Sequence, residues 1–256
     1  MCLINFCFQP NDRYKLVMAA NRDESFVRPT QQAHYWQDAP RILAGRDLEK
    51  MGTWLGVTTS GRIAALTNFR DPSEKIEGKR SRGEIIRSFL ADSQPPEIFM
   101  TQLQQQSNQY PGFNVLAGTA DELWYYSNKK AGIETVLPGT HSLSNAFLNT
   151  PWPKSEKGKA YLEQCLHHSS TLDPECLFSF LQDDEWALDE ALPKTGVPLE
   201  WERKLSPLFI NSEHYGTRSS TVLIIDRTNH VTFAERTYLQ GKLVGEKNFQ
   251  FQIEPK

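Results

Sequence analysis

Strand patterns and helix patterns occur in separate blocks along this chain of 256 residues. Several strands are followed by two helices, then by three strands, two more helices and a final group of strands. Segregated blocks of this kind place helices outside the sheets of an α+β fold, whereas strictly alternating strands and helices build a parallel sheet. The order therefore predicts two sheets with helices outside them, in one domain spanning residues 1–256.

Hydrophobic periodicity and turn residues predict the individual elements. The predicted strands are residues 2–8, 14–20, 54–58, 63–68, 113–117, 122–127, 133–137, 221–226, 230–237 and a last strand after Gly241. The predicted helices are residues 81–91, 95–106, 154–167 and 174–181. The stretch that contains Pro29 and Pro40 is predicted to be irregular, and residues 193–207 are predicted to be mostly loop.

A cysteine follows the first methionine. If Met1 is removed, Cys2 carries both a thiol nucleophile and a free α-amine. Such an amine titrates at about 7.7–8.0, so it can accept the thiol proton without a histidine. The alternative interpretation is that Cys2 is a small buried apolar residue.

Four short polar clusters stand where predicted strands begin or end, at residues 21–24, 67–71, 139–145 and 215–220. Each alone is typical of a solvated turn. Together they offer what a terminal thiol needs: an arginine that favours the thiolate, a carboxylate that holds the ammonium and an amide for an oxyanion. On a regular strand Arg22 and Asp23 would face opposite ways.

Charge and hydropathy exclude several classes of protein. The net charge of −3 and the pI of about 6.1 do not indicate a nucleic-acid partner. Residues 75–87 are locally basic but interrupted by glutamates, so a solvated loop is favoured over a phosphate-binding patch. No signal peptide and no apolar run of about 18 residues is present, so we expect no membrane span.

The cysteines are Cys2, Cys7, Cys165 and Cys176. No two of them form a CxxC pair, and their spacing suggests neither a zinc site nor a disulfide scaffold. This pattern predicts a reducing, cytoplasmic location and no bound metal.

These motifs, taken together, resemble the NRDE family, also called the transport and Golgi organization protein 2 family. The matching residues run through most of the chain. They are Met1-Cys2, Asn21-Arg22-Asp23-Glu24, Gly52-Thr53-Trp54-Leu55-Gly56, Thr67-Asn68-Phe69-Arg70, Leu143-Ser144-Asn145, Thr150-Pro151-Trp152-Pro153-Lys154 and Gly216-Thr217-Arg218-Ser219. One departure is Met51, where the family pattern has a glycine; we expect it to alter a turn.

The family is in turn similar to the N-terminal nucleophile (Ntn) hydrolases, nearest to the choloylglycine hydrolase and penicillin V acylase group. The resemblance implies a four-layer αββα sandwich of two mainly antiparallel sheets with outer helices. It also implies that Cys2 attacks an amide bond, Asp23 holds the α-amine, and Arg22 or Arg218 stabilises the thiolate. Asn145 would help form the oxyanion hole. In those hydrolases two residues separate the arginine from the aspartate, whereas here Arg22 and Asp23 are adjacent.

The NRDE family is also linked to haem trafficking and to acyl-CoA and lipid handling. A small-molecule carrier is therefore the favoured function, and a Cys2-dependent amidase or thioesterase is the alternative. Haem would be cargo, since no cofactor is required. The candidate ligand-binding residues are Asn21, Glu24, Trp54, Asn68, Arg70, His141 and His214. His141 and His214 are the candidate haem ligands, and Arg22, Arg70 and Arg218 could meet the phosphates of acyl-CoA. No sequence feature favours a protein–protein adaptor.

Overall fold

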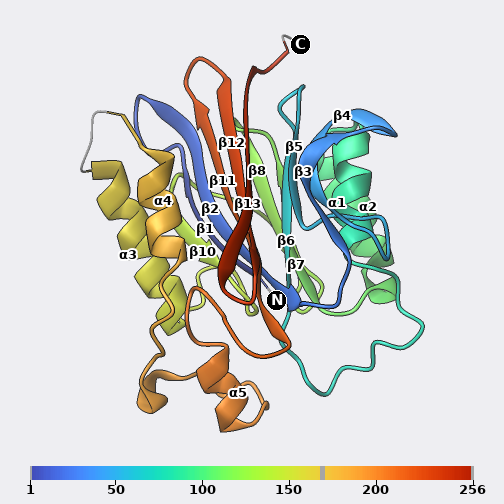
Figure 1. Cartoon of the computed structure of the whole chain (residues 1–256). Helices are drawn as coiled ribbons and strands as arrows, with labels where there is room; N and C mark the ends of the chain where they lie inside the picture. Colours follow the sequence, from blue (N-terminus) through green and yellow to red (C-terminus); the bar gives the residue numbers. More distant parts are fainter. Residues whose placement is uncertain (1, 168–170, 255–256) are drawn as a thin grey trace.

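The computed structural model describes residues 2–167 and 171–254. Over these residues the strands form two sheets, and every strand pair is antiparallel. The sheets stack face to face, with helices on both outer sides (Figure 1). This arrangement confirms the predicted α+β class and its αββα layer order.

The first sheet has the strand order β10-β1-β2-β11-β12-β13. Its strands are β10 (Gly139–Leu143), β1 (Cys2–Phe8), β2 (Tyr14–Ser25), β11 (Tyr215–Asp226), β12 (His230–Leu239) and β13 (Lys242–Gln252). Two helices cover its outer face, α3 (Pro153–His167) and α4 (Pro174–Leu181). They bury an apolar cluster that includes Val17, Leu162 and Phe178.

The second sheet has the order β3-β4-β5-β6-β7-β8-β9. Its strands are β3 (Thr30–Trp36), β4 (Ala39–Asp47), β5 (Leu55–Thr58), β6 (Ile63–Asn68), β7 (Phe113–Gly118), β8 (Leu123–Ser127) and β9 (Ile133–Thr135). The helices α1 (Gly83–Ala91) and α2 (Pro96–Gln106) cover it. The remaining short helices are η1 (Ser107–Gln109), η2 (Asp189–Ala191) and α5 (Leu199–Lys204).

Successive side chains of β1 point alternately into two apolar cores. Ile4, Phe6 and Phe8 belong to the cluster between the sheets, while Leu3 and Cys7 pack toward α3 and α4. Successive side chains on a strand point to opposite faces, so a strand buried on both sides must be apolar on both. All seven residues of β1 are buried.

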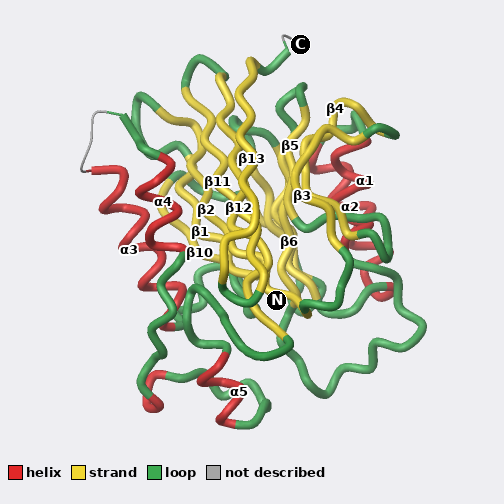
Figure 2. The backbone as a smooth tube through the Cα atoms, viewed as in Figure 1, coloured by secondary structure: helices red, strands yellow, loops and turns green. Residues whose placement is uncertain are grey.

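The structure extends several strands beyond the predicted limits. The tube in Figure 2 shows β2 and β11 as long uninterrupted strands, so the polar residues 21–24 and 215–220 lie inside strands rather than in turns. Residues 139–143, expected to be loop, form β10. These polar residues remain in strands because their backbones pair with a neighbouring strand. Residues 21–24 pair with β11, residues 215–220 pair with β2, and residues 139–143 pair with β1.

The stretch around Pro29 and Pro40 forms the hairpin β3–β4, where the sequence predicted irregular structure. Pro29 precedes β3, and Pro40 lies where the β3–β4 register shifts between Tyr35 and Trp36. Proline is tolerated at strand starts, on edge strands and at bulges, because no ladder hydrogen bond is lost there. The prolines therefore delimit this edge hairpin.

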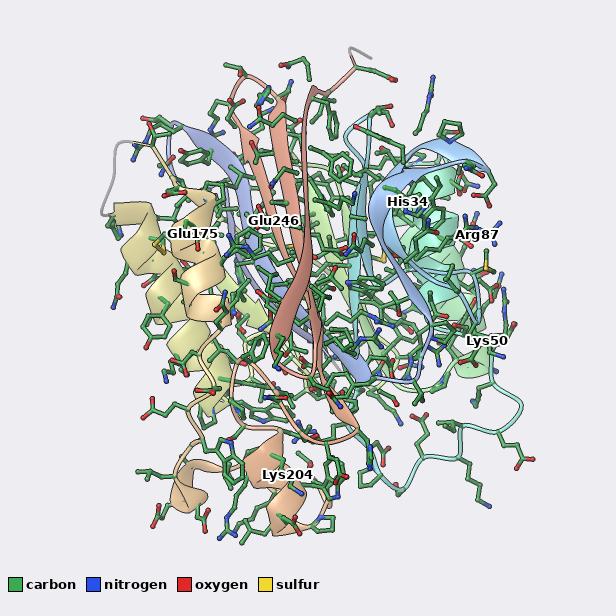
Figure 3. The ribbon with its side chains drawn as sticks, viewed as in Figure 1. His34, Lys50, Arg87, Glu175, Lys204 and Glu246 are labelled. Atoms are coloured by element: carbon green, nitrogen blue, oxygen red, sulfur yellow. A yellow bond between two sulfur atoms is a disulfide. The ribbon has the colours of Figure 1, made fainter. Side chains whose placement is uncertain are left out.

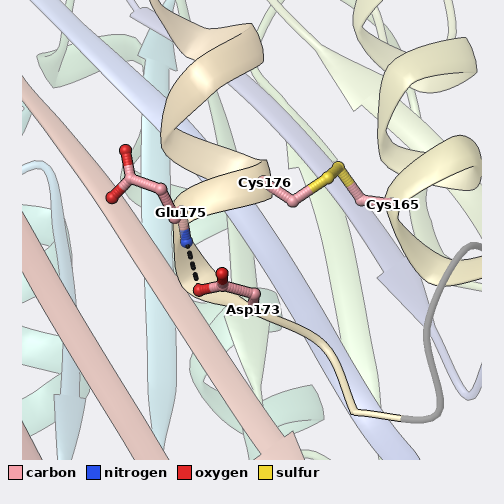
Figure 4. The surroundings of a disulfide bond; sticks show 4 residues. All are labelled: Cys165, Asp173, Glu175 and Cys176. Carbon is pink, nitrogen blue, oxygen red and sulfur yellow. Dashed lines mark hydrogen bonds between the residues drawn. A yellow bond between two sulfur atoms is a disulfide. The ribbon is translucent and has the colours of Figure 1, made fainter.

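Cys165 and Cys176 form a disulfide that joins α3 to α4 (Figure 4). The interpretation that the cysteines form no disulfide is therefore wrong. Their separation of 11 residues spans the end of one helix and the start of the next, and only the packing of the two helices brings them together. The cysteine pattern accordingly gives no support for a reducing compartment. Over the residues described, no helix has the length and apolar character needed to cross a bilayer.

Candidate functional site

A cavity of about 250 Å³ opens where β1 begins, and Cys2 lies in its wall. β1 and β2 pair with Cys2 directly opposite Arg22. The motif residues in the wall are Cys2, Arg22, Asp23, Glu24, Thr53, Trp54 and Asn68. A larger cavity of about 670 Å³ lies at α3 and α4, but it contains none of the motif residues. The chemistry therefore points to the smaller cavity.

The Cys2 thiol is held in a nearly closed environment. The residue is 8% exposed, and burial raises the pKa of its thiol, an effect opposed by the nearby Arg22 guanidinium. The carbonyl of Cys2 accepts a hydrogen bond of 3.3 Å from Ser144 Oγ. A thiol whose neutral form is favoured by burial needs an adjacent base or cation before it can act as a nucleophile.

Arg22 is held beside Cys2 by an aromatic ring. Its guanidinium carbon lies 4.3 Å from the centre of the Trp54 ring, and Nη1 donates to Thr30 Oγ1 at 3.1 Å. The carboxylate of Glu24 is 3.9 Å from Nη2. Only 4% of Arg22 is exposed, so its charge acts on the thiol through protein rather than through bulk water.

Asp23 is fixed from the neighbouring strand β11. Thr217 Oγ1 donates to its Oδ1 at 2.7 Å, and Tyr215 Oη donates to its backbone carbonyl at 3.0 Å. Burial raises the pKa of the Asp23 carboxyl, and the Lys154 ammonium opposes this shift. Lys154 is itself buried, which lowers its pKa to about 8, and it donates to the Leu205 carbonyl at 3.1 Å.

A bulge in β11 places these partners. Thr217 pairs with Asp23 and Ser219 pairs with Arg22, which leaves Arg218 as the extra residue. β2 itself keeps a regular register with β1. Adjacent Arg22 and Asp23 thus take opposite faces of β2 and nevertheless both reach the cavity wall, because Cys2 begins the strand and can be approached from both sides.

The close approach of Gly52 to α1 explains why the Gly52–Gly56 motif begins with glycine. A Cβ on Gly52 would lie 2.5 Å from the backbone carbon of Gly83, at the start of α1. The close contact brings Thr53 and Trp54 into the cavity wall beside Gly83. The preceding Met51 adopts a left-handed φ of 57°, a conformation that glycine takes without strain.

Asn145 lies behind the cavity rather than in its wall. Its Nδ2 donates to the Asn68 carbonyl at 2.9 Å, and its Oδ1 is 3.3 Å from Ser144 Oγ, the hydroxyl that also contacts Cys2. Ser144 therefore links Asn145 to the Cys2 carbonyl. An amide nitrogen has two hydrogens, so the bond to Asn68 leaves the second one for another acceptor.

Three of the predicted site residues stabilise the fold away from the cavity. Asn21 is buried toward α4, where Nδ2 donates to the carbonyls of Leu181 and Leu208. Arg70 forms a buried ion pair of 2.6 Å with Glu202. Arg218 Nη1 donates to the carbonyls of Ser25, Phe26 and Arg28, which fixes the turn between β2 and β3. These internal partners keep the three side chains out of the cavity wall.

Neither candidate haem-ligating histidine lines the cavity. Both ring nitrogens of His141 are engaged, with the Leu137 carbonyl at 2.8 Å and with Asn149 Nδ2 at 3.0 Å. His214 is an exposed side chain next to Glu213. Within residues 2–167 and 171–254, no three His, Cys, Asp or Glu side chains form a group that could hold a metal ion.

The cationic part of the wall was not predicted from the sequence. Lys79, Arg80 and Arg82 come from the loop before α1, Arg28 comes from the turn before β3, and Lys50 comes from the turn after β4. The available signal was the basic stretch at residues 75–87, which was interpreted as a solvated loop. Its position next to Cys2 depends on how the second sheet stacks on the first.

The chain is similar to known proteins in sequence and in fold. The family model "Transport and Golgi organisation 2" matches residues 1–240. The chain is 34% identical to the Transport and Golgi organization 2 homolog of Mus musculus, over 93% of this chain and 94% of the mouse protein. It is 36% identical to the homolog of Bos taurus, over 93% and 94% of the two chains. The structure of a Caenorhabditis elegans N-acylethanolamine-hydrolyzing acid amidase ortholog superposes with a TM-score of 0.52 at 11% identity, covering 86% of this chain and 92% of that one. That likeness concerns the fold alone, which is Ntn-hydrolase-like.

Proposed function

The chain belongs to the Transport and Golgi organisation 2 family, and we propose that Cys2, once Met1 has been removed, acts as an N-terminal nucleophile on an amide or thioester bond of an acyl ligand. The observation that carries this proposal is the meeting of Cys2, Arg22 and Asp23 at one cavity. A thiol, a cation beside it and a carboxylate within reach of the strand end are the groups that this chemistry requires.

The first half of the reaction transfers the acyl group to sulfur. The α-amine of Cys2 accepts the thiol proton, the Arg22 guanidinium stabilises the thiolate, and Asp23 holds the resulting ammonium. The thiolate attacks the carbonyl carbon to give a tetrahedral oxyanion. When the intermediate collapses, the bond to the leaving amine or thiol breaks and the ammonium returns the proton to that group.

The second half restores the enzyme. Water loses a proton to the α-amine and attacks the acyl carbon. The carbon–sulfur bond then breaks, and the ammonium returns the proton to the departing sulfur. The products are a carboxylic acid and the free thiol, so no cofactor enters the balance. Arg22 and Asp23 serve the same roles in both halves, because a thiolate and an ammonium form on Cys2 in each half.

Intact-mass spectrometry of the full chain tests this function. Cys2→Ala and the matched control Cys7→Ala are incubated with a panel of acyl amides and acyl thioesters. We expect a chain without Met1 that gains an acyl mass, or releases product, in wild type and Cys7→Ala and not in Cys2→Ala. Retention of Met1, or turnover that persists in Cys2→Ala, contradicts the proposal.

The burial of Cys2 favours a second candidate function. Because burial raises the pKa of the thiol, the cavity is also suited to holding an acyl ligand such as acyl-CoA without turnover. For haem, Cys2 is the one histidine or cysteine among the described residues that line this cavity. A Soret shift on haem titration that disappears in Cys2→Ala supports a haem carrier, and the absence of saturable binding of haem and acyl-CoA contradicts this candidate.

A further inference from the structure

The cavity at Cys2 carries more positive than negative charge. Its cations are Arg22, Arg28, Lys50, Lys79, Arg80 and Arg82, and its carboxylates are Asp23, Glu24 and Asp47. The chain as a whole is acidic, with a net charge of −3, so this excess is local. A wall with low dielectric and one dominant sign of charge concentrates ligands of the opposite sign.

Several of these cations are already neutralised by neighbours. Arg28 forms an ion pair of 2.6 Å with Asp47, and Arg80 pairs with Glu84 on α1. Arg22 is stacked on Trp54 beside the nucleophile. Arg22 also lies 3.9 Å from Glu24, and Lys50 lies 3.9 Å from Glu49. Together these contacts account for four of the cations and for two of the carboxylates in the wall.

Lys79 and Arg82 have no such carboxylate partner in the part of the chain that the structure describes. Lys79 Nζ donates to the backbone carbonyl of Asn108, and Arg82 Nη1 donates to the carbonyl of Gly112 at 3.0 Å. A guanidinium has five N–H donors, and this one uses a single donor on the protein. Arg82 is only partly exposed, and burial lowers its pKa, an effect that the nearby carboxylates of Glu74 and Glu24 oppose without forming an ion pair with it. The structure thus keeps a partly buried guanidinium with unused N–H donors at the cavity.

The loop that carries both residues lies beside the nucleophile. It leaves β6 at the edge of the sheets where β1 begins and leads into α1 (Figure 1). Arg82 is the residue before the first turn of α1, whose first residue, Gly83, also lines the cavity. The backbone N–H groups at the start of a helix add positive potential at the same point.

We propose that Arg82 and Lys79 bind an anionic group of the ligand, a phosphate, sulfonate or carboxylate, at the mouth of the Cys2 cavity. The inference rests on the proposed function, because it takes the cavity to be the acyl-binding site. It names the substrate class as acyl compounds that carry a negatively charged group beyond the acyl carbonyl. The free N–H donors of Arg82 match the planar or tetrahedral oxygens of such a group, and Lys79 adds a second charge.

Binding of small probes to the full-length Cys2→Ala chain tests this assignment without turnover. Titration calorimetry compares octyl phosphate, octanesulfonate and octanoate with neutral octanol, at low and at high salt. We expect the best anion to bind about tenfold or more tightly than octanol, with an advantage that shrinks as salt rises. The order among the three anions identifies the kind of anionic group. Equal binding of octanol and all three anions overturns the proposal.

Variants of Arg82 test whether this residue binds the anion. We expect Arg82→Gln to weaken binding of the best anion by about tenfold and to leave octanol binding unchanged, and Arg82→Lys to restore part of the loss. The matched control is Arg87→Gln, on the outer side of the same helix (Figure 3). Arg87→Gln should bind as the parent does. An equal loss in Arg87→Gln and Arg82→Gln overturns the proposal, and partial rescue by Arg82→Lys shows that a loss does not reflect misfolding.

Failure of this inference is distinguishable from failure of the proposed function. Acylation of Cys2 in the wild-type chain by neutral amides and thioesters is measured separately by intact mass. Acylation without any preference for anions refutes the anion site and leaves the nucleophile in place. A preference for anions that depends on Arg82, without acylation, supports the anion site and refutes the hydrolase.

Discussion

Cys2 and Arg22 stand directly opposite each other where β1 and β2 pair, and both side chains line one cavity. Residues opposite each other in an antiparallel pair have neighbouring side chains on the same face. The register of two strands therefore brings a cation to the thiol. The same register sends Asp23 to the other face, where Thr217 of β11 holds it.

Replacing Arg22 should slow the reaction of the Cys2 thiol. We expect Arg22→Met to raise the thiol pKa, because a cation that favours the thiolate is lost, and to move the pH–rate profile of alkylation by iodoacetamide to higher pH. The rate at neutral pH should fall severalfold. Arg218→Met is the control, since Arg218 bonds to three carbonyls away from the cavity. Identical profiles for wild type and Arg22→Met contradict this prediction.

Glu235 should make the stability of the fold depend on pH. It is buried between the sheets, where its Oε1 accepts a hydrogen bond of 2.7 Å from the Ala33 amide, and burial raises its pKa from 4.5 to about 7. The folded state thus binds a proton that the unfolded chain has released, so stability falls as pH rises from about 4.5 to 7. The whole loss is at most about 3 kcal/mol.

Urea unfolding between pH 5 and pH 8 measures this effect. Glu235→Gln keeps an oxygen acceptor for Ala33 and removes the titration, so its free energy of unfolding should vary less over that interval. Glu97→Gln, at an exposed position on α2, should keep the slope of the wild type. The same slope in Glu235→Gln and wild type shows that Glu235 is not the titrating group.

Reduction of the Cys165–Cys176 disulfide should destabilise the fold. The bond closes a short loop between α3 and α4, and loops of about this length contribute roughly 2–3 kcal/mol. We expect dithiothreitol to lower the urea midpoint of the wild type. The double variant Cys165→Ala, Cys176→Ala should have the lower midpoint with or without the reductant. Cys7→Ala should remain sensitive to it, and an insensitive wild type would argue against the disulfide.

Gly52→Ala should weaken the packing that forms the cavity wall. The added Cβ would lie 2.5 Å from the backbone carbon of Gly83, and backbone cannot move aside as a flexible side chain does. We expect a loss of about 1–3 kcal/mol in the free energy of unfolding. Met51→Ala is the neighbouring control, because Met51 is exposed and its change leaves the contact intact. A Gly52→Ala chain as stable as wild type would mean that α1 can shift without loss.

Local sequence predicted elements whose pattern is strong over their whole length. β1 was predicted with its limits, because its residues are almost all apolar. The helix α1 was predicted from its apolar stripe of Ile85, Ile86, Phe89 and Leu90. The hairpin β3–β4 was missed, because its polar, proline-flanked pattern is also typical of loop and only pairing with β5 makes it part of a sheet.

The residues of the candidate site were likewise predicted only in part. The sequence motifs, together with the family resemblance that they carry, pointed to Cys2, Arg22, Asp23, Glu24, Trp54 and Asn68, and these six residues line one cavity. Asn21 and Arg70 belong to the same motifs and are used as internal supports, because each has buried partners from distant segments. A sequence motif does not distinguish residues that contact a ligand from residues that stabilise the fold.

The sequence by itself determined the block order of strands and helices, and hence the layer order, because periodicity and turn residues act over short stretches of chain. It also pointed to Arg22, Asp23 and Glu24 as groups that accompany Cys2. The tertiary structure alone decided that Lys79 and Arg82 lie at Cys2 and that Cys165 meets Cys176. The physical reason is that contacts between distant segments depend on how sheets stack and helices pack, and burial then sets the charge and reactivity of each group.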